Sequence, residues 1–299
     1  MSTGQTKAYN PRSIVIRSIK PNYREGTERF WFAGNPFITH FINTLSFQFP
    51  SGEEQFVKSV NYFKDQVKDS NLRAQIKGFI GQESLHGKVH ADFNQWVASL
   101  VPEAEQYCAA IAKRHREKNK MIIDRDPRLA LSITVGFEHM TAIMAGALLR
   151  RPQTMGKMAP EVRALMIWHA IEEIEHKSVA FDVYQTVGGG YLKRVFGMLL
   201  ATISLTFTTA AYNFLLLKRD KQLFNVPALL SALNELFGLN GYFTGIAFAY
   251  LRYFKPGFHP SQQDDSELLK MGHAALVKLT PVQVNGRQLE ADPSLDKGA

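Results

Sequence analysis

The chain has 299 residues, a formal net charge of +8 and a pI of about 9.4. Hydrophobic residues make up 45% of it, which excludes a disordered chain and indicates a folded, core-rich protein. The single cysteine, Cys108, excludes an internal disulfide and a cysteine-based zinc site, and it agrees with a reducing cytoplasmic interior. The positive charge favours an anionic partner, either a membrane or a nucleic acid.

The N-terminal part of the chain predicts an arm followed by helices. Residues 1–10 are polar without an apolar core, so we expect no signal peptide. Residues 1–34 indicate an irregular basic arm, in which the positive charges are Arg12, Arg17, Lys20, Arg24 and Arg29. Beyond it, helix signals predict an all-α fold with helices over about 35–48, 51–69, 71–99, 103–120, 127–150 and 160–187.

Local signals set the ends of these predicted helices. Asn35-Pro36 is a favourable start, and Phe49-Pro50-Ser51-Gly52 predicts a break between the first two helices. Ser51 and Glu54 have the spacing of a capping box for the second helix. Asp126-Pro127 and Pro160 open later helices, and Gly188–Gly190 end the last one.

The composition changes after these glycines. Residues 195–217 contain no charged side chain and are long enough to cross a bilayer. A second apolar segment, about 223–254, is interrupted by Pro227, Asn234, Glu235 and Asn240. We treat 191–254 as an apolar helical pair, which is either membrane-associated or buried in a larger bundle. A short helix near 264–278 is expected in the C-terminal tail, 255–299.

Two Glu-x-x-His pairs carry the chemistry. Glu83 and His86 are followed one turn later by His90, and Glu173 and His176 are preceded one turn earlier by His169. At about 100° per residue, each set of three falls on the apolar face of its helix. A charged side chain directed at a core is costly unless it is paired or bound to a metal.

Two further carboxylates complete the pattern. Glu138 is the only acidic residue between Pro127 and Pro152, and Glu53 lies in phase with the apolar residues of its helix, whereas Glu54 does not. A carboxylate from each of two helices with Glu-x-x-His from each of two others is typical of carboxylate-bridged dinuclear centres. We therefore predict a ferritin-like helical bundle over 35–190 that holds two divalent metal ions, iron before manganese or zinc.

Several assignments stay open at this point. His90 and His169 are either additional ligands or groups that orient the carboxylates. Glu172 is an alternative to Glu173, while Glu175 is expected to face solvent and His139 to be a neighbour of the site. The basic run 113–120 indicates a solvated helix face or a contact with lipid headgroups. It lacks interleaved aromatic residues, so no nucleic-acid partner is expected.

Four stretches resemble a bacterial family named predicted metal-dependent hydrolases. They are Phe49-Pro-Ser-Gly-Glu-Glu-Gln-Phe56, Gly81-Gln-Glu-Ser-Leu-His86 with His90, Glu138-His-Met-Thr-Ala142, and Trp168-His-Ala-Ile-Glu-Glu-Ile-Glu-His-Lys-Ser-Val-Ala-Phe-Asp182. The resemblance covers about 30–260, and it departs at Gln55-Phe56, where the family has an aromatic pair. It implies hydrolysis of a substrate that is not settled, and metal ligands at Glu53, Glu83, His86, His90, Glu138, His169, Glu173 and His176.

Three functions follow from this pattern. The carboxylate-rich helical site favours O2-dependent oxidation of a hydrophobic substrate by a di-iron enzyme. The alternative is a metal-dependent hydrolase that uses a metal-bound hydroxide, with Glu172 as general base. The third is a non-catalytic metal-binding protein. The expected partners are a hydrophobic small molecule, a membrane lipid, an electron donor and a second copy of the chain, in the cytoplasm or at the inner membrane.

Overall fold

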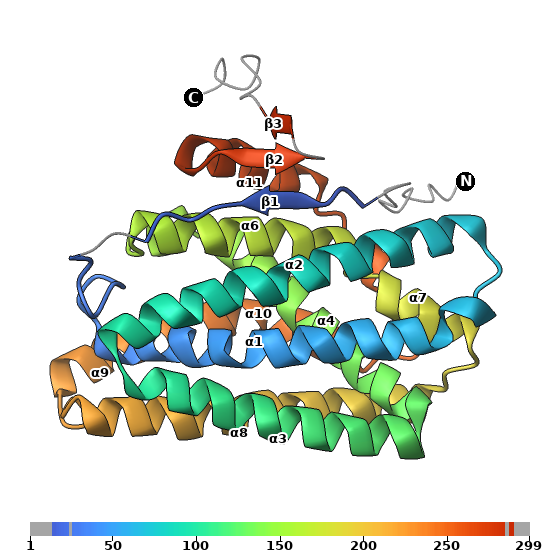
Figure 1. Cartoon of the computed structure of the whole chain (residues 1–299), viewed down its shortest axis with the longest axis horizontal. Helices are drawn as coiled ribbons and strands as arrows, with labels where there is room; N and C mark the ends of the chain where they lie inside the picture. The colour runs from blue at the N-terminus through green and yellow to red at the C-terminus, as the bar shows by residue number, and fades with distance from the viewer. Residues whose placement is uncertain (1–13, 24–25, 285–286, 290–299) are drawn as a thin grey trace.

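Helices form most of the molecule (Figure 1), which confirms the predicted all-α class. The structure is a computed structural model that describes residues 14–23, 26–284 and 287–289. In chain order the helices are α1 (Pro36–Phe63), α2 (Ser70–Leu100), α3 (Glu103–Arg125), α4 (Pro127–Leu149), α5 (Pro152–Gly156), α6 (Pro160–His176), α7 (Val179–Thr186), α8 (Tyr191–Arg219), α9 (Val226–Phe237), α10 (Tyr242–Arg252) and α11 (Ser266–Leu279), with short 3-10 turns at Lys64–Gln66 and Pro260–Gln262.

The predicted break at Phe49–Gly52 is wrong, because α1 continues through it. Pro50 has no N–H to donate to the carbonyl of Ser46, one turn earlier. The side-chain amide of Asn94 on α2 donates to that carbonyl instead, over 3.1 Å. Ser51 therefore lies inside a helix and caps nothing. The prediction at the start of α1 is confirmed, since the Asn35 side chain accepts hydrogen bonds from the first turn.

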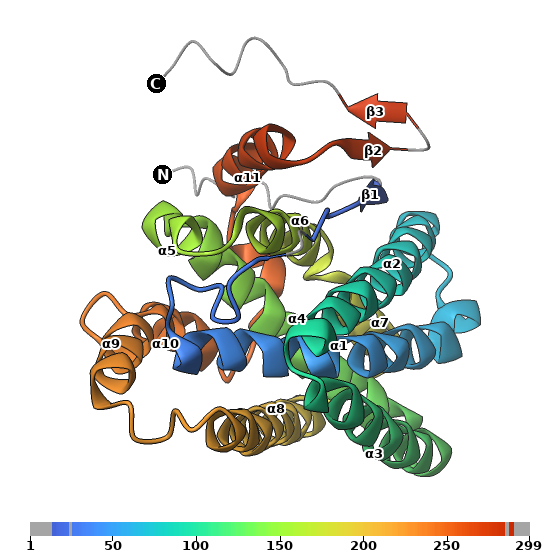
Figure 2. The ribbon, with the colours of Figure 1, turned by 60° about the vertical axis from the view of Figure 1, so that its left-hand side comes forward.

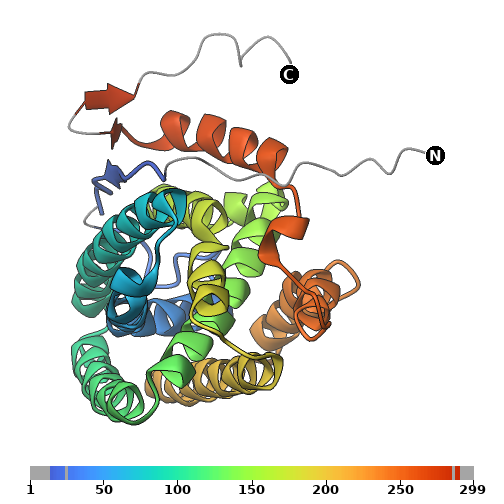
Figure 3. The same ribbon diagram turned by 90° about the vertical axis from the view of Figure 1, so that its right-hand side faces the viewer.

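Four helices enclose the middle of the molecule. α1 packs on α2, α2 on α6, α6 on α4, and α4 on α1, and Figure 3 shows them around a common centre. Along α2, Leu72, Ile76 and Phe79 belong to one apolar cluster, and Phe93 and Val97 belong to another. The polar residues of this helix that point inward lie between the two clusters. The apolar core is therefore divided by a polar layer.

The predicted helix over 160–187 is two helices. α6 ends at His176, and α7 begins at Val179 after a turn at Lys177 and Ser178. The Lys177 ammonium is buried and donates to the carbonyl of Gln263 and to the carboxylate of Asp265. The chain changes direction where this buried charge is held. Gly188, which was predicted as a helix stop, has a φ of +76°, a conformation that suits glycine.

A small antiparallel sheet joins the two ends of the chain. β1 (Arg17–Ile19) pairs with β2 (Val282–Val284), which pairs with β3 (Arg287–Leu289). The strands lie beside α11 and α6 in Figure 1. The prediction of an irregular arm and tail is wrong for these segments, because three-residue strands are too short to give an alternation signal. Arg12, Arg24 and the tail from residue 290 lie outside the described residues.

The apolar segment after Gly190 forms α8, α9 and α10. α8 packs along α4 and α1, whereas α9 contacts α1 and α10 contacts α4. The second predicted segment is two helices, because the chain turns at Gly238–Gly241. Among the described residues, two helices, α4 and α8, are long and apolar enough to cross a membrane. This is weak evidence, since α4, with 78% of its apolar window buried, is a core helix. The division of the chain at 34/35, 190/191 and 254/255 stays a prediction.

Candidate metal centre

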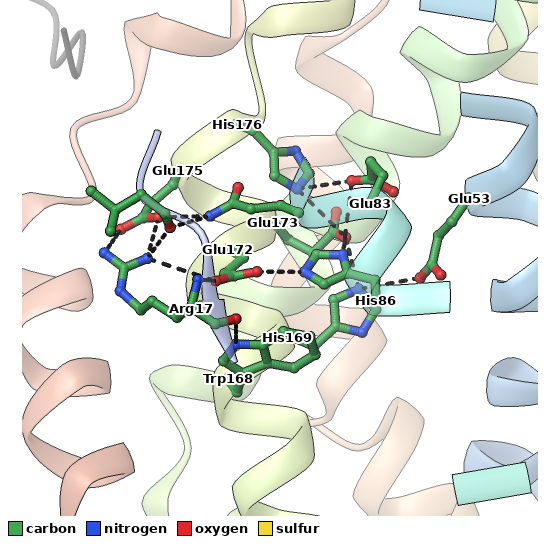
Figure 4. A network of polar contacts seen from close by, with 12 residues as sticks. Arg17, Glu53, Glu83, His86, Trp168, His169, Glu172, Glu173, Glu175 and His176 are labelled. Carbon is green, nitrogen blue, oxygen red and sulfur yellow. Dashed lines mark hydrogen bonds and ion pairs between the residues drawn. The ribbon is translucent and has the colours of Figure 1, made fainter. Parts of the chain in front are cut away.

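The eight predicted ligands gather in the polar layer between the four central helices. Each is buried, and the most exposed of them, His169, has 6% of its surface accessible. α1 provides one residue, α4 one, and α2 and α6 three each, and Figure 4 shows many of these side chains pointing toward one another. They are Glu53, Glu83, His86, His90, Glu138, His169, Glu173 and His176.

One group combines the two Glu-x-x-His pairs. Glu83, His86, Glu173 and His176 each offer a ligand atom, and these atoms lie within 4.8 Å of one another. His176 Nε2 is 2.9 Å from Glu83 Oε1, and His86 Nδ1 is 3.5 Å from Glu173 Oε1. The inward nitrogens of the two histidines therefore converge with two carboxylates on one point.

A second group consists of Glu53, His90 and His169, again within 4.8 Å of one another. His90 Nε2 lies 2.6 Å from His169 Nδ1, and His169 Nε2 lies 2.7 Å from Glu173 Oε1. Glu173 thus contacts both groups. Of the two positions that the sequence left open, Glu173 rather than Glu172 lies at the centre.

Each histidine of the Glu-x-x-His pairs has a carboxylate on its other nitrogen. Glu172 Oε2 is 3.0 Å from His86 Nε2, and Glu138 Oε2 is 3.0 Å from His176 Nδ1. Such contacts fix the ring orientation and the tautomer of a histidine ligand. Glu172 and Glu138 therefore direct the free nitrogens of His86 and His176 toward the centre. Glu138, predicted as a ligand, lies beside the centre but belongs to neither group.

His90 is oriented by two neutral side chains. The Asn94 amide nitrogen donates to the Ser46 carbonyl, so its Oδ1 faces the Ser46 hydroxyl and accepts from it over 2.7 Å. The Ser46 oxygen, 2.9 Å from His90 Nδ1, is then left to accept the Nδ1 proton. This leaves the lone pair of His90 on Nε2, which faces the centre. Asn94 therefore serves both this histidine and the carbonyl that Pro50 leaves free.

The buried polar atoms of this layer test whether a metal fits. Within the described residues, seven inward atoms make no hydrogen bond of acceptable geometry, although His176 Nε2 and Glu83 Oε1 lie within ion-pair distance. They are Glu53 Oε1 and Oε2, Glu83 Oε1 and Oε2, His86 Nδ1, Glu138 Oε1 and His176 Nε2. Buried polar atoms without partners are costly, and bound ions are a usual explanation of them. Imidazole and carboxylate donors suit iron, manganese and zinc. The residues present therefore fit a divalent metal.

The crowding of ionisable side chains in this layer also indicates a site for a cation. Burial raises the pKa of Glu138 to about 8, against the effect of His176, and burial also holds the pKa of Glu53 well above its usual value. Burial alone would lower the pKa of His86, but the neighbouring carboxylates of Glu172 and Glu173 raise it well above the usual value. Protons on His86, Glu53 and Glu138 thus reduce the net negative charge of this layer, and a bound cation would displace them.

The arm contributes contacts that sequence reasoning missed. The backbone N–H of Arg17 donates to Glu172 Oε1 over 3.1 Å, and the Arg17 guanidinium forms an ion pair with Glu175 at 2.7 Å (Figure 4). Glu175 was expected to face solvent, but it is only partly exposed and lies between Arg17 and His273. No periodicity links an arm residue to a helix 155 residues away, so only the general need of a buried carboxylate for a cation was available as a signal.

The remaining acidic and histidine residues near these helices lie outside the two groups. Glu54 faces outward and pairs with Lys58 and Arg116, which supports the choice of Glu53 over it. His139 was expected to be a neighbour of the site, and its Nε2 lies 3.2 Å from the Ala249 carbonyl. It packs against the rings of Tyr253 and Phe258.

An apolar cavity reaches the centre from the side of α9 and α10. Its walls come from α1, α4, α6 and the loop before α1, and His169 and Glu173 lie in them among aliphatic and aromatic side chains. Thr141 also lines it, and its hydroxyl donates to Glu173 Oε2. A second cavity, between α1, α3, α4 and α8, reaches Glu53. Phe49 lies in the walls of both and stands edge-on to His90 and His169.

A helical bundle with converging glutamates and histidines in its core defines the class: an all-α protein with buried residues that could hold a metal ion. Within that class, the chain belongs to the family described as predicted metal-dependent hydrolase, whose model matches residues 15–264. No curated protein and no solved structure matches the chain. The family match confirms the resemblance predicted from the motifs. It supports the hydrolase alternative better than the oxidation that the carboxylate pattern favoured.

Proposed function

We propose that the protein is a metal-dependent hydrolase that cleaves an ester or amide bond in a substrate with a long apolar part. The observation that carries this proposal is the position of His169 and Glu173, which belong to the candidate metal centre and also line an apolar cavity. An apolar chain held in the cavity brings its polar end to these residues. The family description favours the same class of reaction.

Two divalent ions are proposed, and the two groups of ligands would each hold one of them. Glu173 belongs to the first group and contacts His169 of the second. When bound, they supply Lewis-acid polarisation of a carbonyl oxygen and acidify a coordinated water. The chain's own residues do the positioning. Thr141 and His169 hold the two oxygens of Glu173, and Phe49 excludes water from the edges of His90 and His169.

Glu172 is given a positioning role here. It was the predicted general base, which stays untested, but one of its oxygens accepts from the Arg17 backbone and the other contacts His86. It does not belong to the residues that line the cavity with His169 and Glu173. Its contacts favour orientation of the His86 ring, and the β1 strand in turn fixes the Glu172 carboxylate.

The test measures hydrolysis of p-nitrophenyl esters of increasing acyl length by protein loaded with zinc, manganese or iron. We expect kcat/KM to rise roughly fourfold per methylene, about 0.8 kcal/mol, until the cavity is full. Ile42→Trp, which enlarges a side chain in the cavity wall, should remove the preference for long chains and leave the shortest ester unaffected. Glu54→Gln is the control, and it should keep both the preference for long chains and the activity with the shortest ester. Absence of hydrolysis with every metal would refute the proposal.

Oxidation of a hydrophobic substrate is the second candidate. It is favoured by one observation, the glutamates from α1 and α4 beside Glu-x-x-His pairs from α2 and α6, a pattern of carboxylate di-iron proteins. Anaerobic protein loaded with ferrous iron distinguishes the two. Oxygen uptake with a change in the visible spectrum would favour oxidation, whereas hydrolysis that proceeds equally with zinc and without oxygen would favour the hydrolase.

A further inference from the structure

The outward side of α8 is apolar from end to end. Seven positions at helical spacing face away from the bundle, and Leu192, Ile203 and Phe207 expose 79%, 64% and 61% of their surface. A surface helix of a soluble protein places charged and polar residues on this side. The seven residues, which we call the α8 stripe, are Leu192, Phe196, Leu199, Ile203, Phe207, Ala210 and Phe214.

The opposite side of α8 is held tightly to the bundle. Gly197 lies so close to α4 that a Cβ there would come within 2.4 Å of the Ser132 hydroxyl. A Cβ at Gly136 would come within 2.9 Å of the Met198 backbone. This glycine-mediated contact fixes α8 along α4. The helix therefore lies on the surface of the molecule and presents its stripe outward, rather than being free to leave the bundle.

The helices that follow extend the apolar surface. Phe224 and Leu239, in the turns around α9, are 90% and 98% exposed, and Phe237 and Phe248 are exposed on α9 and α10. In Figures 2 and 3 the sheet and α11 lie on one side of the molecule and α8 on the opposite side, with α9 and α10 on the flank next to it. So many large apolar side chains in one region exceed the scattered exposure of an ordinary surface.

The charged residues around this apolar surface indicate which kind of partner covers it. Residues 191–255 contain seven lysines and arginines and two acidic residues, Asp220 and Glu235. Both acidic residues are engaged in ion pairs, Asp220 with Arg29 and Glu235 with Lys157. Exposed lysines lie at the ends of the helices, at 218, 221 and 255. An apolar surface bordered by positive charge matches the interior and the headgroups of an anionic lipid bilayer.

We propose that the α8 stripe and the exposed residues of α9 and α10 dock on an anionic bilayer, with α8 parallel to the membrane plane. In the part of this proposal that rests on the proposed function, the apolar cavity takes its substrate from the same bilayer. Exposed Phe237 stacks on Phe243, which contacts Phe41 in the cavity wall. Leu236 and Tyr242 line the cavity from α9 and α10, so an apolar path joins the docking surface to Glu173.

Flotation of the full chain with vesicles tests the docking. We expect binding to phosphatidylcholine vesicles that contain phosphatidylglycerol, weaker binding to pure phosphatidylcholine, and partial release at high salt. Ile203→Glu with Phe207→Glu should reduce the bound fraction at least about tenfold, because two inserted apolar side chains become charged. Met271→Glu is the matched control, since Met271 is an equally exposed apolar residue on α11.

Three outcomes would overturn the docking. They are a wild-type chain that stays with the soluble fraction, a double variant that binds as well as the wild type, and a stripe buried in a dimer. Light scattering without vesicles checks the last: we expect the mass of wild type and double variant to agree, whereas a dimer lost in the variant would assign the stripe to a second copy of the chain.

Substrate delivery is tested separately from docking. Hydrolysis of a long-chain ester embedded in anionic vesicles should fall in the double variant, while hydrolysis of a short, water-soluble ester should be unchanged. Equal loss of both would refute delivery from the bilayer. A wild-type protein that binds vesicles but hydrolyses neither ester would refute the proposed function and leave the docking intact.

Discussion

The centre of the bundle and the α8 stripe depart from the usual distribution of side chains in opposite directions. The centre places four glutamates and four histidines in the interior, and the stripe places leucine, isoleucine and phenylalanine against solvent. Each region carries groups that its immediate surroundings do not satisfy. Seven inward atoms at the centre make no hydrogen bond of acceptable geometry within the described part of the chain.

The comparison of the centre with the α8 stripe indicates what kind of partner each region would bind. In the interior, a divalent cation would balance the charge of the buried carboxylates. On the surface, a lipid bilayer would cover the exposed apolar side chains. The two regions also differ in how they are held. The central residues come from four helices and are fixed by further contacts, whereas the stripe belongs to one helix that is fixed through its other side. Substitutions in the two regions should therefore have separable effects.

Glu173→Ala should have the largest effect. Glu173 contacts both ligand groups, so its removal disrupts both at once. We expect metal affinity to fall about 1,000-fold, roughly 4 kcal/mol, with complete loss of hydrolysis. Metal titration followed by calorimetry measures it, with Glu54→Gln as a surface control. Retention of full metal affinity would mean that Glu173 is not a ligand.

Met198→Ala tests the inner side of α8. Met198 is fully buried against α4, so truncation leaves a cavity in the contact that holds the helix. We expect a loss of about 3 kcal/mol in the free energy of unfolding, measured by denaturant titration. Metal content should not change. A loss below about 0.5 kcal/mol would mean that α8 is not firmly held on the bundle.

Asp220→Asn removes the carboxylate that joins the C-terminal end of α8 to His40 and Arg29. Burial would raise the pKa of Asp220, but hydrogen bonds from His40 and Arg29 lower it to about 2. The ionised carboxylate therefore stabilises the fold above pH 4 and loses this effect as the pH falls toward 2. We expect the variant to lose about 2 kcal/mol at pH 7 and to be less sensitive to acid over that range. Thermal unfolding from pH 7 to 2 measures both.

Glu172→Gln and Glu138→Gln form a matched pair, since each removes the carboxylate that orients one of the Glu-x-x-His histidines. We expect each to weaken metal affinity about tenfold without removing it. The acidic limb of the pH–rate profile should shift in both. If only Glu172→Gln abolished turnover while metal affinity stayed at the wild-type value, Glu172 would be the general base that the sequence suggested.

Ile203→Glu should have the smallest effect on folding. Its side chain faces away from the bundle, so we expect a change within about 0.5 kcal/mol in the free energy of unfolding. Metal content should match that of the wild type. Denaturant titration beside Met198→Ala measures the contrast between the two sides of one helix. A loss as large as that of Met198→Ala would place the stripe in a folded contact.

The sequence was sufficient to predict which residues the structure brings together at the centre, because that information is local. Glu83 and His86, like Glu173 and His176, lie one turn apart, and helical phase directs each pair inward. Glu138 could be found because it is the only acidic residue in its apolar helix. The choice of Glu53 over Glu54 also followed from phase. Which histidine nitrogen points to the centre could not be predicted, because Glu172, Glu138 and Ser46 decide it through contacts between helices.

The errors in the predicted fold have the same cause. Continuity of α1 through Pro50 depends on Asn94, which lies on another helix. The contact of Arg17 with Glu172 joins parts of the chain that are far apart in sequence, through strands of three residues. The turn between α6 and α7 depends on Asp265 near the other end of the chain. Rules based on neighbouring residues contain none of this information.

Metal stoichiometry of the purified full chain tests the central claim most directly. After incubation with iron, manganese or zinc and removal of excess metal, we predict two ions per wild-type chain and a melting temperature well above that of chelator-treated protein. Glu54→Gln should match the wild type, and Glu53→Gln should lose metal. A chain that retains no metal, and whose melting temperature is the same with and without chelator, would contradict the account.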